Sequence, residues 1–297
     1  MRTFFDELAK KLAERWVTLL VLPGALFAMA CWVGLTLGHT RALDWSAAFS
    51  AGVAALGRIP PATQLVLVIG ALLAFAGVGL AIQLLSSVTR RLWLGQWPEP
   101  LRRPFTRRRR ARWHRLVARR RAAEAEQSKE ERTAAHQQDI DRLAARANRF
   151  ALAEPGRPTW MGDRAHAVER IADDRYGLDL RFAWARLWLL LPDSDRAAIG
   201  AADTAFTGAV TAGTWAVPYL GLAVWWWPAA IVGVLVGMVG WARGRTAMAD
   251  LTALTEATLD LRGRDLAVTL GVAGPDTCGP LTPAEGRQIT GITRKGR

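Results

Sequence analysis

The sequence predicts an all-α, polytopic membrane protein whose four transmembrane helices form two hairpins, with a helical cytoplasmic insert between them. Residues 204–242 carry no charged side chain, and two further uncharged runs occupy residues 16–38 and 62–88. A bilayer core about 30 Å thick is crossed by roughly 20 helical residues, so the long run is sufficient for two spans. The charged residues are concentrated between these runs, as is typical of a membrane protein with soluble parts.

The first hairpin is predicted at residues 16–88. An amphipathic helix at residues 1–15 leads into it, because apolar side chains recur every fourth residue at Phe4, Leu8, Leu12 and Trp16. A secretory signal peptide with a lipoprotein-like cleavage site before Cys31 is the competing interpretation. It is disfavoured because the leading segment carries three acids. A short polar loop at residues 39–59 is expected to connect the two spans.

The second hairpin is predicted at residues 204–245, with spans at about 204–222 and 226–244. Pro218 and Pro228 bracket a run rich in tryptophan. Proline disfavours a continuing helix, and aromatic side chains favour the membrane–water interface. The turn of this hairpin is therefore expected between the two prolines.

One helix in each hairpin carries small residues at intervals of three and four, which place them on one helix face. Small residues at this spacing let two backbones approach closely, and such contact is a main source of helix association in lipid. We therefore predict helix packing along two stripes: Gly70, Ala74, Gly77 and Ala81 in the first hairpin, and Gly233, Gly237, Gly240 and Gly244 in the second.

Positive charge is concentrated immediately after the second span. Between Arg90 and Arg121 the chain has 13 arginines and one acid, Glu99, and the net charge of the whole chain is +13. Positively charged loops stay on the cytoplasmic side, so an even number of spans places both termini in the cytoplasm. The excess of arginine and alanine is typical of a GC-rich bacterial genome. The predicted location is the bacterial cytoplasmic (inner) membrane.

A cluster of six arginines in this basic segment is predicted to contact anionic lipid head groups, each contributing about 1 kcal/mol near the surface. Its members are Arg102, Arg103, Arg107, Arg108, Arg109 and Arg110. Interleaved tryptophans at positions 93, 97 and 113 also match the chemistry of single-strand nucleic-acid binding. Nucleic acid is the disfavoured partner, because topology and lipid contact account for a basic cluster directly after a span.

The insert at residues 89–203 is predicted to be a helical cytoplasmic domain. Ser128 and Glu131 match a capping box and predict a helix that reaches about Ala153. This helix has a narrow apolar seam that suits contact with another helix. The seam consists of Ile140, Leu143, Ala147 and Phe150.

Residues 159–192 are the most distinctive part of the insert. Asp163 is expected to cap one short helix, and Asp179 to cap another that ends near Leu191. The second helix carries Trp184, Leu187, Trp188 and Leu191 on one side. It is too short to span a bilayer, so it is expected in the interface or buried between helices.

Part of this segment resembles a family of uncharacterised bacterial multi-pass membrane proteins. In that family an R-Y-G-hydrophobic-D segment is followed by W-x-R-L-W-x-L-L-P just before the last membrane hairpin. The matching residues are Arg175, Tyr176, Gly177, Leu178 and Asp179, then Trp184, Arg186, Leu187, Trp188, Leu190, Leu191 and Pro192. The resemblance covers roughly residues 158–198. It implies the membrane architecture and brings no activity and no catalytic residues.

The distinctive segment is also the candidate functional region. Gly177 is expected to take a backbone conformation that is closed to other residues. Arg175 and Arg186 either bind an anionic ligand or pair with nearby acids. The nearest acids in the sequence are Asp173 and Asp179, and pairing with them would make the segment a structural tie.

The chain after the second hairpin, residues 246–297, is predicted to form a cytoplasmic helix followed by a mobile tail. Apolar residues at helical spacing indicate the helix, and the chain from Gly271 onward is rich in Gly, Pro and Thr. Thr282 and Glu285 are expected to cap one brief turn near Leu281.

The residue pattern predicts no catalytic residue, no cofactor and no metal site. The four histidines have no second ligand at metal spacing, and no phosphate loop or HExxH motif occurs. Two cysteines make neither a disulfide framework nor a metal set. The predicted spans contain no charged residue except Arg243 at the cytoplasmic end of the last one, and this disfavours a secondary transporter.

Two classes of function are consistent with these features. The first is a non-catalytic, membrane-anchored structural or regulatory module whose helical cytoplasmic domain binds a partner or ligand. The alternative is a homo-oligomeric ion channel or pore, since two hairpins that flank a helical domain resemble in layout the bestrophin-type anion channels. The chain has none of the motifs of those channels, but a pore can be lined by uncharged residues. A homo-oligomer or a protein partner is expected in either class.

Overall fold

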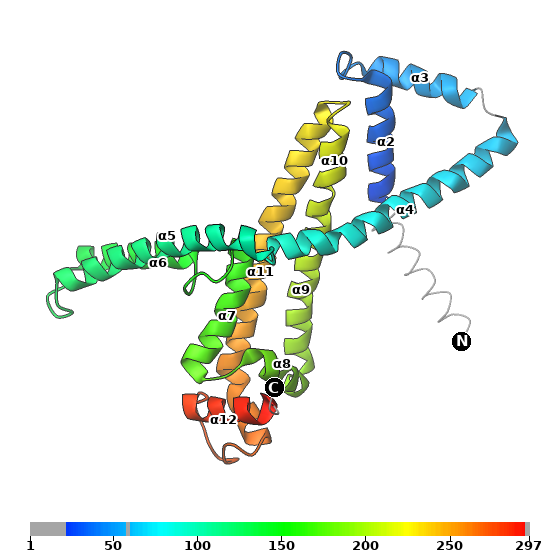
Figure 1. Ribbon diagram of the computed structural model, residues 1–297. Coiled ribbons are helices and arrows are strands. Elements are labelled where there is room, and N and C mark those ends of the chain that lie inside the picture. Colours follow the sequence, from blue (N-terminus) through cyan, green and yellow to red (C-terminus); the bar gives the residue numbers. More distant parts are fainter. Residues whose placement is uncertain (1–21, 58–59, 295–297) are drawn as a thin grey trace, which may run out of the picture. The chain divides into compact units, whose positions relative to one another are not determined.

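The computed structural model describes residues 22–57 and 60–294, which form helices and connecting loops and no β-strand (Figure 1). The predicted all-α fold class is confirmed for these residues. The amphipathic helix predicted at residues 1–15 lies outside them. The chain divides into two compact units. The apolar unit contains residues up to Thr89 and Gly208–Arg243, and the polar unit contains Arg90–Thr207 and the residues from Gly244 onward.

The first half of the apolar unit is built from α2 (Leu22–Leu37), α3 (Trp45–Gly57) and the greater part of α4 (Pro61–Trp93). α2 crosses α4 so closely that a side chain at Gly24 would collide with the backbone of Phe75. The lack of a side chain at Gly24 is therefore what permits this crossing.

The polar loop predicted at residues 39–59 was wrong over most of its length, because α3 occupies it. Residues 45–57 carry no charged side chain, and they are rich in alanine, the best helix former. The exposed side chains of Trp45, Phe49 and Val53 recur every fourth residue, so they form one apolar row along the helix.

The second hairpin consists of α9 (Asp193–Thr214), α10 (Ala216–Leu222) and α11 (Pro228–Thr269). Its turn lies between Pro218 and Pro228, as predicted. Pro218 lies inside α10. It has no N–H to donate to the carbonyl of Thr214, and this accounts for the break between α9 and α10.

A buried tryptophan fastens the turn of the second hairpin to the loop of the first. Trp226 lies in a core cluster with residues of α2, and its indole N–H donates to the carbonyl of Ala42 at 2.9 Å. The His39 ring lies 2.8 Å from the carbonyl oxygen of Val224. A buried indole N–H requires such a partner, so these contacts fix the two connections against each other.

The small-residue stripe of α11 packs against α9 and α10. A Cβ added at Gly240 would lie 2.6 Å from the backbone nitrogen of Gly213, so the two helices touch backbone to backbone. At Gly237 the added atom would lie 3.2 Å from the Cβ of Ala216. At Gly244, in the polar unit, it would lie 2.7 Å from the indole of Trp93.

The stripe of α4 makes no such contact within the described chain. Gly70, Ala74, Gly77 and Ala81 are all exposed, and no atom lies within 4 Å of a Cβ added at Gly70 or Gly77. α2 meets α4 at Phe75, on another face. Packing along this stripe stays a prediction that concerns contacts with another chain.

One helical stretch among the described residues, Val66–Trp93, is long and apolar enough to cross a membrane, and α2 is a shorter apolar helix. The described residues thus contain one candidate span, and the four spans stay a prediction. The described part of α2 begins only at Leu22. α9 carries Asp203 within its length, and the apolar start of α11 ends at Arg243.

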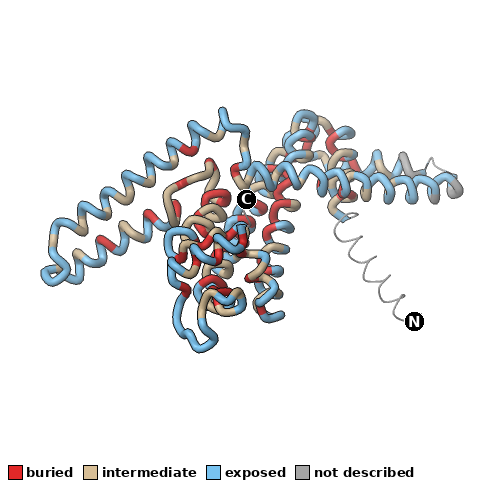
Figure 2. The backbone as a smooth tube through the Cα atoms, turned by 60° about the horizontal axis from the view of Figure 1, so that its bottom comes forward, coloured by how far each residue is buried: buried red, intermediate tan, exposed pale blue. Residues whose placement is uncertain are grey.

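The polar unit consists of an arm and a helical core. The arm is formed by α5 (Glu99–Glu126) and α6 (Ala134–Phe150), which lie side by side and are mostly exposed (Figures 1 and 2). The core is formed by α7 (Trp160–Tyr176), α8 (Leu180–Leu190), α12 (Pro283–Arg294) and the last part of α11. Its most buried members include Ala172, Leu178, Ala183, Leu187, Leu266 and Ile289.

The arm retains the predicted seam, but its second helix begins later than predicted. Ile140 and Ala147 are buried between α5 and α6. The capping box at Ser128 was wrong: Thr133 caps α6 and accepts from the N–H of His136. The residues before Thr133 are needed to reverse the chain, and among them Arg132 donates to the carbonyl of Glu124 at 2.9 Å, at the end of α5.

The C-terminal helix α12 is longer than the one turn predicted near Leu281. Thr282 and Glu285 form its capping box, as the N–H of Thr282 donates to the Glu285 carboxylate at 2.8 Å. These bonds hold the pKa of Glu285 below its usual value. Ile289 is fully buried, because α12 packs across α7 and α8. The predicted tail therefore contributes to the core of the polar unit.

The two stripes predict opposite outcomes for the same substitution. Gly240→Leu should lower the free energy of unfolding by about 1–3 kcal/mol, because the new side chain meets the backbone of α9. The matched variant Gly77→Leu should leave the monomer unchanged, since its Cβ position is open. Thermal unfolding of both variants in detergent provides the measurement. Equal melting temperatures for the two variants would contradict the close approach of α9 and α11.

Candidate functional site

The segment around Tyr176 joins three helices of the polar unit. Tyr176 ends α7 with its side chain buried, and its hydroxyl donates to the carboxylate of Asp260 on α11. Burial, together with this hydrogen bond, raises the pKa of the Tyr176 hydroxyl. The unusual backbone predicted at Gly177 is confirmed, with φ of +64° at the end of α7. α7 is thereby tied to α11.

The predicted pairing of Arg175 with Asp173 was wrong. Arg175 lies 3.7 Å from the carboxylates of both Glu256 and Asp260 on α11. Asp173 is exposed. The actual partners are more than 80 residues away in the sequence, and local spacing gives no sign of them.

Asp179 caps α8, as predicted, and also contacts α12. Its carboxylate accepts from the N–H of Arg181, and a second oxygen lies 3.0 Å from Arg294. The backbone N–H of Asp179 donates to the hydroxyl of Thr290 at 2.9 Å. The predicted pairing of Arg186 with Asp179 was therefore wrong, because α12 supplies the cation.

α8 is a short buried helix with its aromatic side on a groove. Leu187 is fully buried, whereas Trp184 and Trp188 are half-buried and their ring centroids lie 6.0 Å apart. Arg186 donates to the carbonyl of Phe182 at 2.6 Å within the same helix. The polar groups of residues 175–186 are thus engaged in the fold of the polar unit, which is the arrangement of a structural tie.

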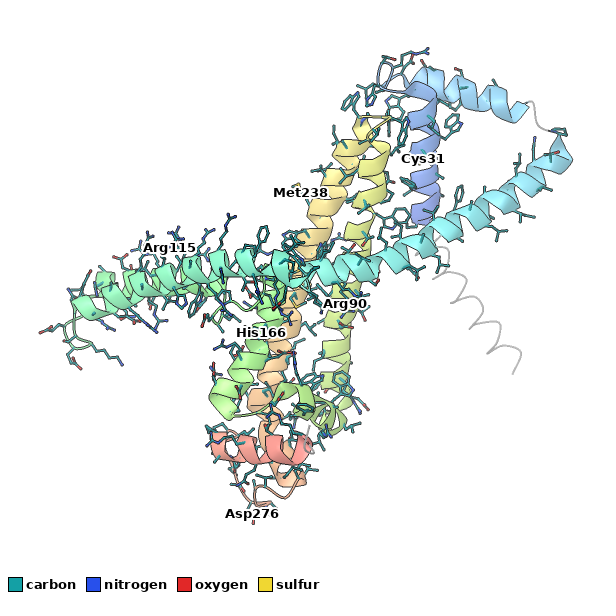
Figure 3. The ribbon with its side chains drawn as sticks, viewed as in Figure 1. Cys31, Arg90, Arg115, His166, Met238 and Asp276 are labelled. Carbon is teal, nitrogen blue, oxygen red and sulfur yellow. The ribbon has the colours of Figure 1, made fainter. Side chains whose placement is uncertain are left out.

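The groove beside α8 continues toward the start of the polar unit. A cavity of about 670 Å³ lies against Trp184 and Trp188, and a second of about 370 Å³ lies between Trp184 and Phe206. Arg90, labelled in Figure 3, lies at the rim, 3.4 Å from Asp203 and 5.6 Å from the centre of the Phe206 ring. Its charge is thereby paired, and the groove floor is apolar.

A buried ion pair holds the arm to the helical core. Arg109 of α5 donates to the Asp163 carboxylate at 2.7 Å, and Asp163 is 4% exposed. The backbone N–H of Arg157 donates to the other oxygen at 2.6 Å. Burial raises the pKa of the Asp163 carboxyl, and these two donors oppose the rise. The expected cap at Asp163 was wrong, because Thr159 caps α7 and leaves Asp163 to face the arm.

The six predicted lipid-facing arginines do not share one role. Arg102 and Arg103 pair with Glu99 on their own helix, and Arg110 lies near Glu154. The predicted lipid contact was wrong for Arg109, because its side chain is paired with the buried Asp163. The remaining two, Arg107 and Arg108, are exposed, and neither forms an ion pair with any described residue.

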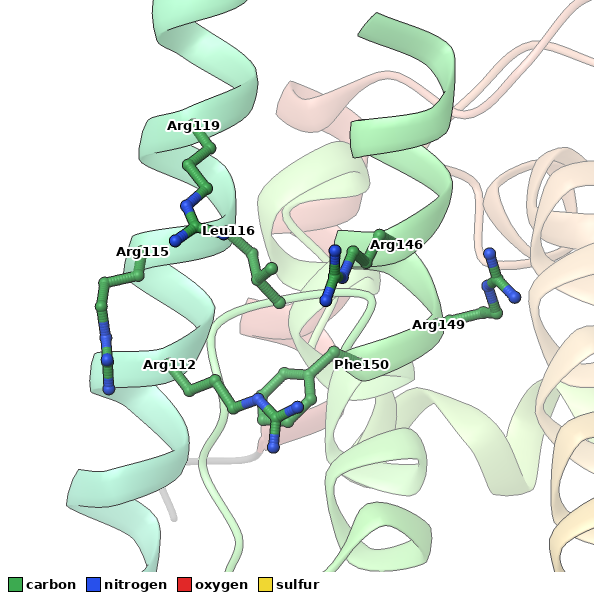
Figure 4. A pocket seen from close by; sticks show the side chains of 7 residues that line it. All are labelled: Arg112, Arg115, Leu116, Arg119, Arg146, Arg149 and Phe150. Carbon is green, nitrogen blue, oxygen red and sulfur yellow. The ribbon is translucent and has the colours of Figure 1, made fainter. Parts of the chain in front are cut away.

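A group of five arginines without ion-pair partners among the described residues lies farther along the arm, in a groove of about 360 Å³ between α5 and α6 (Figure 4). We call it the arginine groove. It is lined by Arg112, Arg115, Leu116, Arg119, Arg146, Arg149 and Phe150. None of these five arginines forms an ion pair within the described part of the chain. No acidic residue lines the groove.

The floor of the arginine groove is fixed by an aromatic ring. The guanidinium carbons of Arg109 and Arg112 lie 4.7 and 5.1 Å from the centre of the Phe150 ring, which is within the range of cation–π attraction. Trp113, beside it, donates its indole N–H to the carbonyl of Ala151 at 3.3 Å. The end of α6 is thus held against α5 by ring and backbone contacts.

The arginine groove was missed because the basic segment was assigned as a whole to topology and lipid contact, and its named cluster ended at Arg110. A usable signal was present in the spacing. Arg112, Arg115 and Arg119 follow one another at intervals of three and four, and Arg146 and Arg149 flank the seam residue Ala147. Two helices that meet along the seam bring these residues to one side. Over the described ranges, no cluster of three His, Cys, Asp or Glu side chains has the arrangement of a metal site.

Loss of Arg109 should destabilise the polar unit far more than loss of its neighbour. Arg109→Met leaves a buried carboxylate without its cation, which should cost about 3–5 kcal/mol of the free energy of unfolding. Arg108→Met, at an exposed position, should change it by no more than about 0.5 kcal/mol. Thermal or denaturant unfolding of the two variants makes the comparison. Combining Arg109→Met with Asp163→Asn should recover part of the loss, and equal stability of both single variants would contradict the buried pair.

Comparison of the chain with protein-family models, with curated proteins and with solved structures found no match.

Proposed function

We propose that this chain is a multi-pass protein of the bacterial cytoplasmic membrane, in which the apolar unit is the anchor and the polar unit is a non-catalytic, cytoplasmic regulatory or structural module. The proposal includes the four spans and the membership in the bacterial family that the segment from Arg175 to Pro192 resembles. The module acts by binding a ligand or partner, since its most distinctive surface is an unpaired positive one.

The observation that carries the proposal is the junction of α4 and α5. α4 exposes most of its leucine, isoleucine and valine side chains between Val66 and Val88. Only 17% of its apolar stretch is buried, whereas the core helix of a soluble protein is mostly buried. A helix that is apolar all round and exposed requires lipid or another protein chain.

The helix that follows has the opposite character. α5 contains eleven arginines and three glutamates, and it begins a few residues after the end of α4. Arginines next to a span are retained on the cytoplasmic side, and each contributes about 1 kcal/mol of attraction to an anionic lipid surface. The arm is therefore placed at the cytoplasmic face, with Arg107 and Arg108 available to head groups.

The topology of the proposal is tested with reporters. A reporter that is active only in the cytoplasm should be active when fused to the C-terminus, because α12 belongs to the basic side. The same reporter inserted after Asp44 should be inactive, because that loop is expected on the opposite side. Activity at both positions, or at Asp44 alone, would reject the four-span topology.

A homo-oligomeric pore is the second candidate, and the open face of α4 favours it. The stripe of Gly70, Ala74, Gly77 and Ala81 is exposed in the single chain, although small residues at this spacing favour helix contact in lipid. A second copy that packs there would bury the stripe.

The pore candidate predicts ion flux that depends on this stripe. Liposomes reconstituted with the full chain should release a trapped ion, and Gly77→Leu should abolish both the flux and the oligomer seen in detergent. Gly57→Leu, at another open glycine outside the stripe, is the control and should alter neither. Liposomes that stay tight with the wild-type protein would leave the non-conducting module as the function.

A further inference from the structure

We propose that the arginine groove between α5 and α6 binds a ligand that carries two or more phosphate groups. The inference deepens the proposed function by naming the chemistry of its ligand, and it rests on that function for the location of the groove at the cytoplasmic face. The ligand is either the head group of an anionic lipid or a soluble oligophosphate, and the two sources share the same chemistry.

The geometry of the groove suits more than one phosphate. Arg112, Arg115 and Arg119 come from α5, and Arg146 and Arg149 come from α6. Figure 4 shows Arg112, Arg119 and Arg146 around the floor of Leu116 and Phe150, with Arg115 and Arg149 on the outer sides. A single phosphate accepts a bidentate bond from one or two guanidinium groups. Five groups distributed over two helices therefore match a ligand with separated phosphates.

The electrostatics of the empty groove favour an anion. Several arginines elsewhere on the arm have acidic partners, as in the pairs Arg103–Glu99 and Arg120–Glu124. The arginine groove has no such partner, and the acids of the arm lie toward its start and its tip. Like charges held close together repel one another. An anion that occupies the groove removes this repulsion.

The aromatic residues of the groove argue against single-stranded nucleic acid. Such binding requires exposed rings on which bases stack. The Phe150 ring lies beside the guanidinium groups of Arg109 and Arg112, and Trp113 is half-buried with its N–H bonded to Ala151. Among the residues that line the groove, the one aromatic ring is that of Phe150, and guanidinium groups already lie against it. The free groups are guanidinium forks, which suit phosphate oxygens.

Two double variants with equal loss of charge test the site. Arg119→Gln with Arg146→Gln removes one free arginine from each wall of the groove. Arg107→Gln with Arg108→Gln removes two exposed arginines of the same arm outside the groove. None of these four side chains forms an ion pair with a described residue, so both variants are expected to fold, and melting temperatures without ligand check this.

The first measurement is the affinity of the full chain in detergent for tripolyphosphate, by calorimetry at two salt concentrations. The wild type should bind tripolyphosphate. The affinity of the groove variant should be at least about tenfold lower, because charge-assisted hydrogen bonds are lost. The control variant should stay within about twofold of the wild type. An equal loss in both variants would show diffuse attraction to charge and overturn the proposal, as would the absence of binding to the wild type.

The second measurement distinguishes the two sources of phosphate. Nanodiscs are prepared with a lipid that has two phosphates in one head group, and with single-phosphate lipid at the same total charge. Preferential stabilisation by the two-phosphate lipid, lost in the groove variant, assigns the site to a head group. Groove-dependent binding of tripolyphosphate without this preference assigns it to a soluble ligand. An RNA oligonucleotide that binds in the groove more tightly than tripolyphosphate would overturn the ligand class.

These results are separable from failure of the proposed function. Tripolyphosphate binding in detergent does not depend on membrane topology. If the reporters reject the four-span topology while the groove variant still loses binding, the phosphate site is supported and the proposed membrane anchor is rejected. If the reporters support the four-span topology and both variants bind tripolyphosphate equally, the membrane anchor is supported and the phosphate site is rejected.

Discussion

The position of the arm depends on one buried carboxylate. Asp163 is removed from water and accepts from Arg109 on the arm and from the backbone of Arg157. A buried charge is tolerated only when its oxygens are paired and hydrogen-bonded, so α5 cannot leave α7 without exposing or stranding this group. The ring of Phe150 lies over the same arginine. The arginine groove is therefore held in shape by a contact at its inner end.

The arginines of the arm fall into two groups with different consequences. Those near the core are engaged: Arg109 with Asp163, and Arg110 with Glu154 and the carbonyl of Pro155. Those farther out on the groove form no ion pair with a described residue. A basic composition alone does not separate the two groups, because the distinction lies in what the fold places opposite each guanidinium. Net charge predicts attraction to anions, and the pairing decides where that attraction acts.

Local chemistry accounts for the features that were predicted correctly. The cap at Asp179, the backbone of Gly177 and the turn after Pro218 all depend on residues within a few positions of one another. The ion pairs of Arg175 and Arg109 could not be predicted in this way, since they join helices separated by more than 50 residues. α3 was missed for another reason: the charged residues Arg41, Asp44 and Arg58 led to the whole of residues 39–59 being assigned to a polar loop, although the stretch between them is uncharged. Its alanines favour helix without regard to position.

The backbone at the end of α7 limits which residues can replace Gly177 in a related sequence. Gly177 has φ of +64°, and a Cβ added there would lie 2.6 Å from the carbonyl oxygen of Pro283, at the start of α12. The first condition disfavours every other residue, and the second also excludes those that tolerate a positive φ, such as asparagine. A relative that lacked glycine at this point would have to move α12 away. The loss of this glycine in a related sequence is therefore a marker that its C-terminal helix is docked differently.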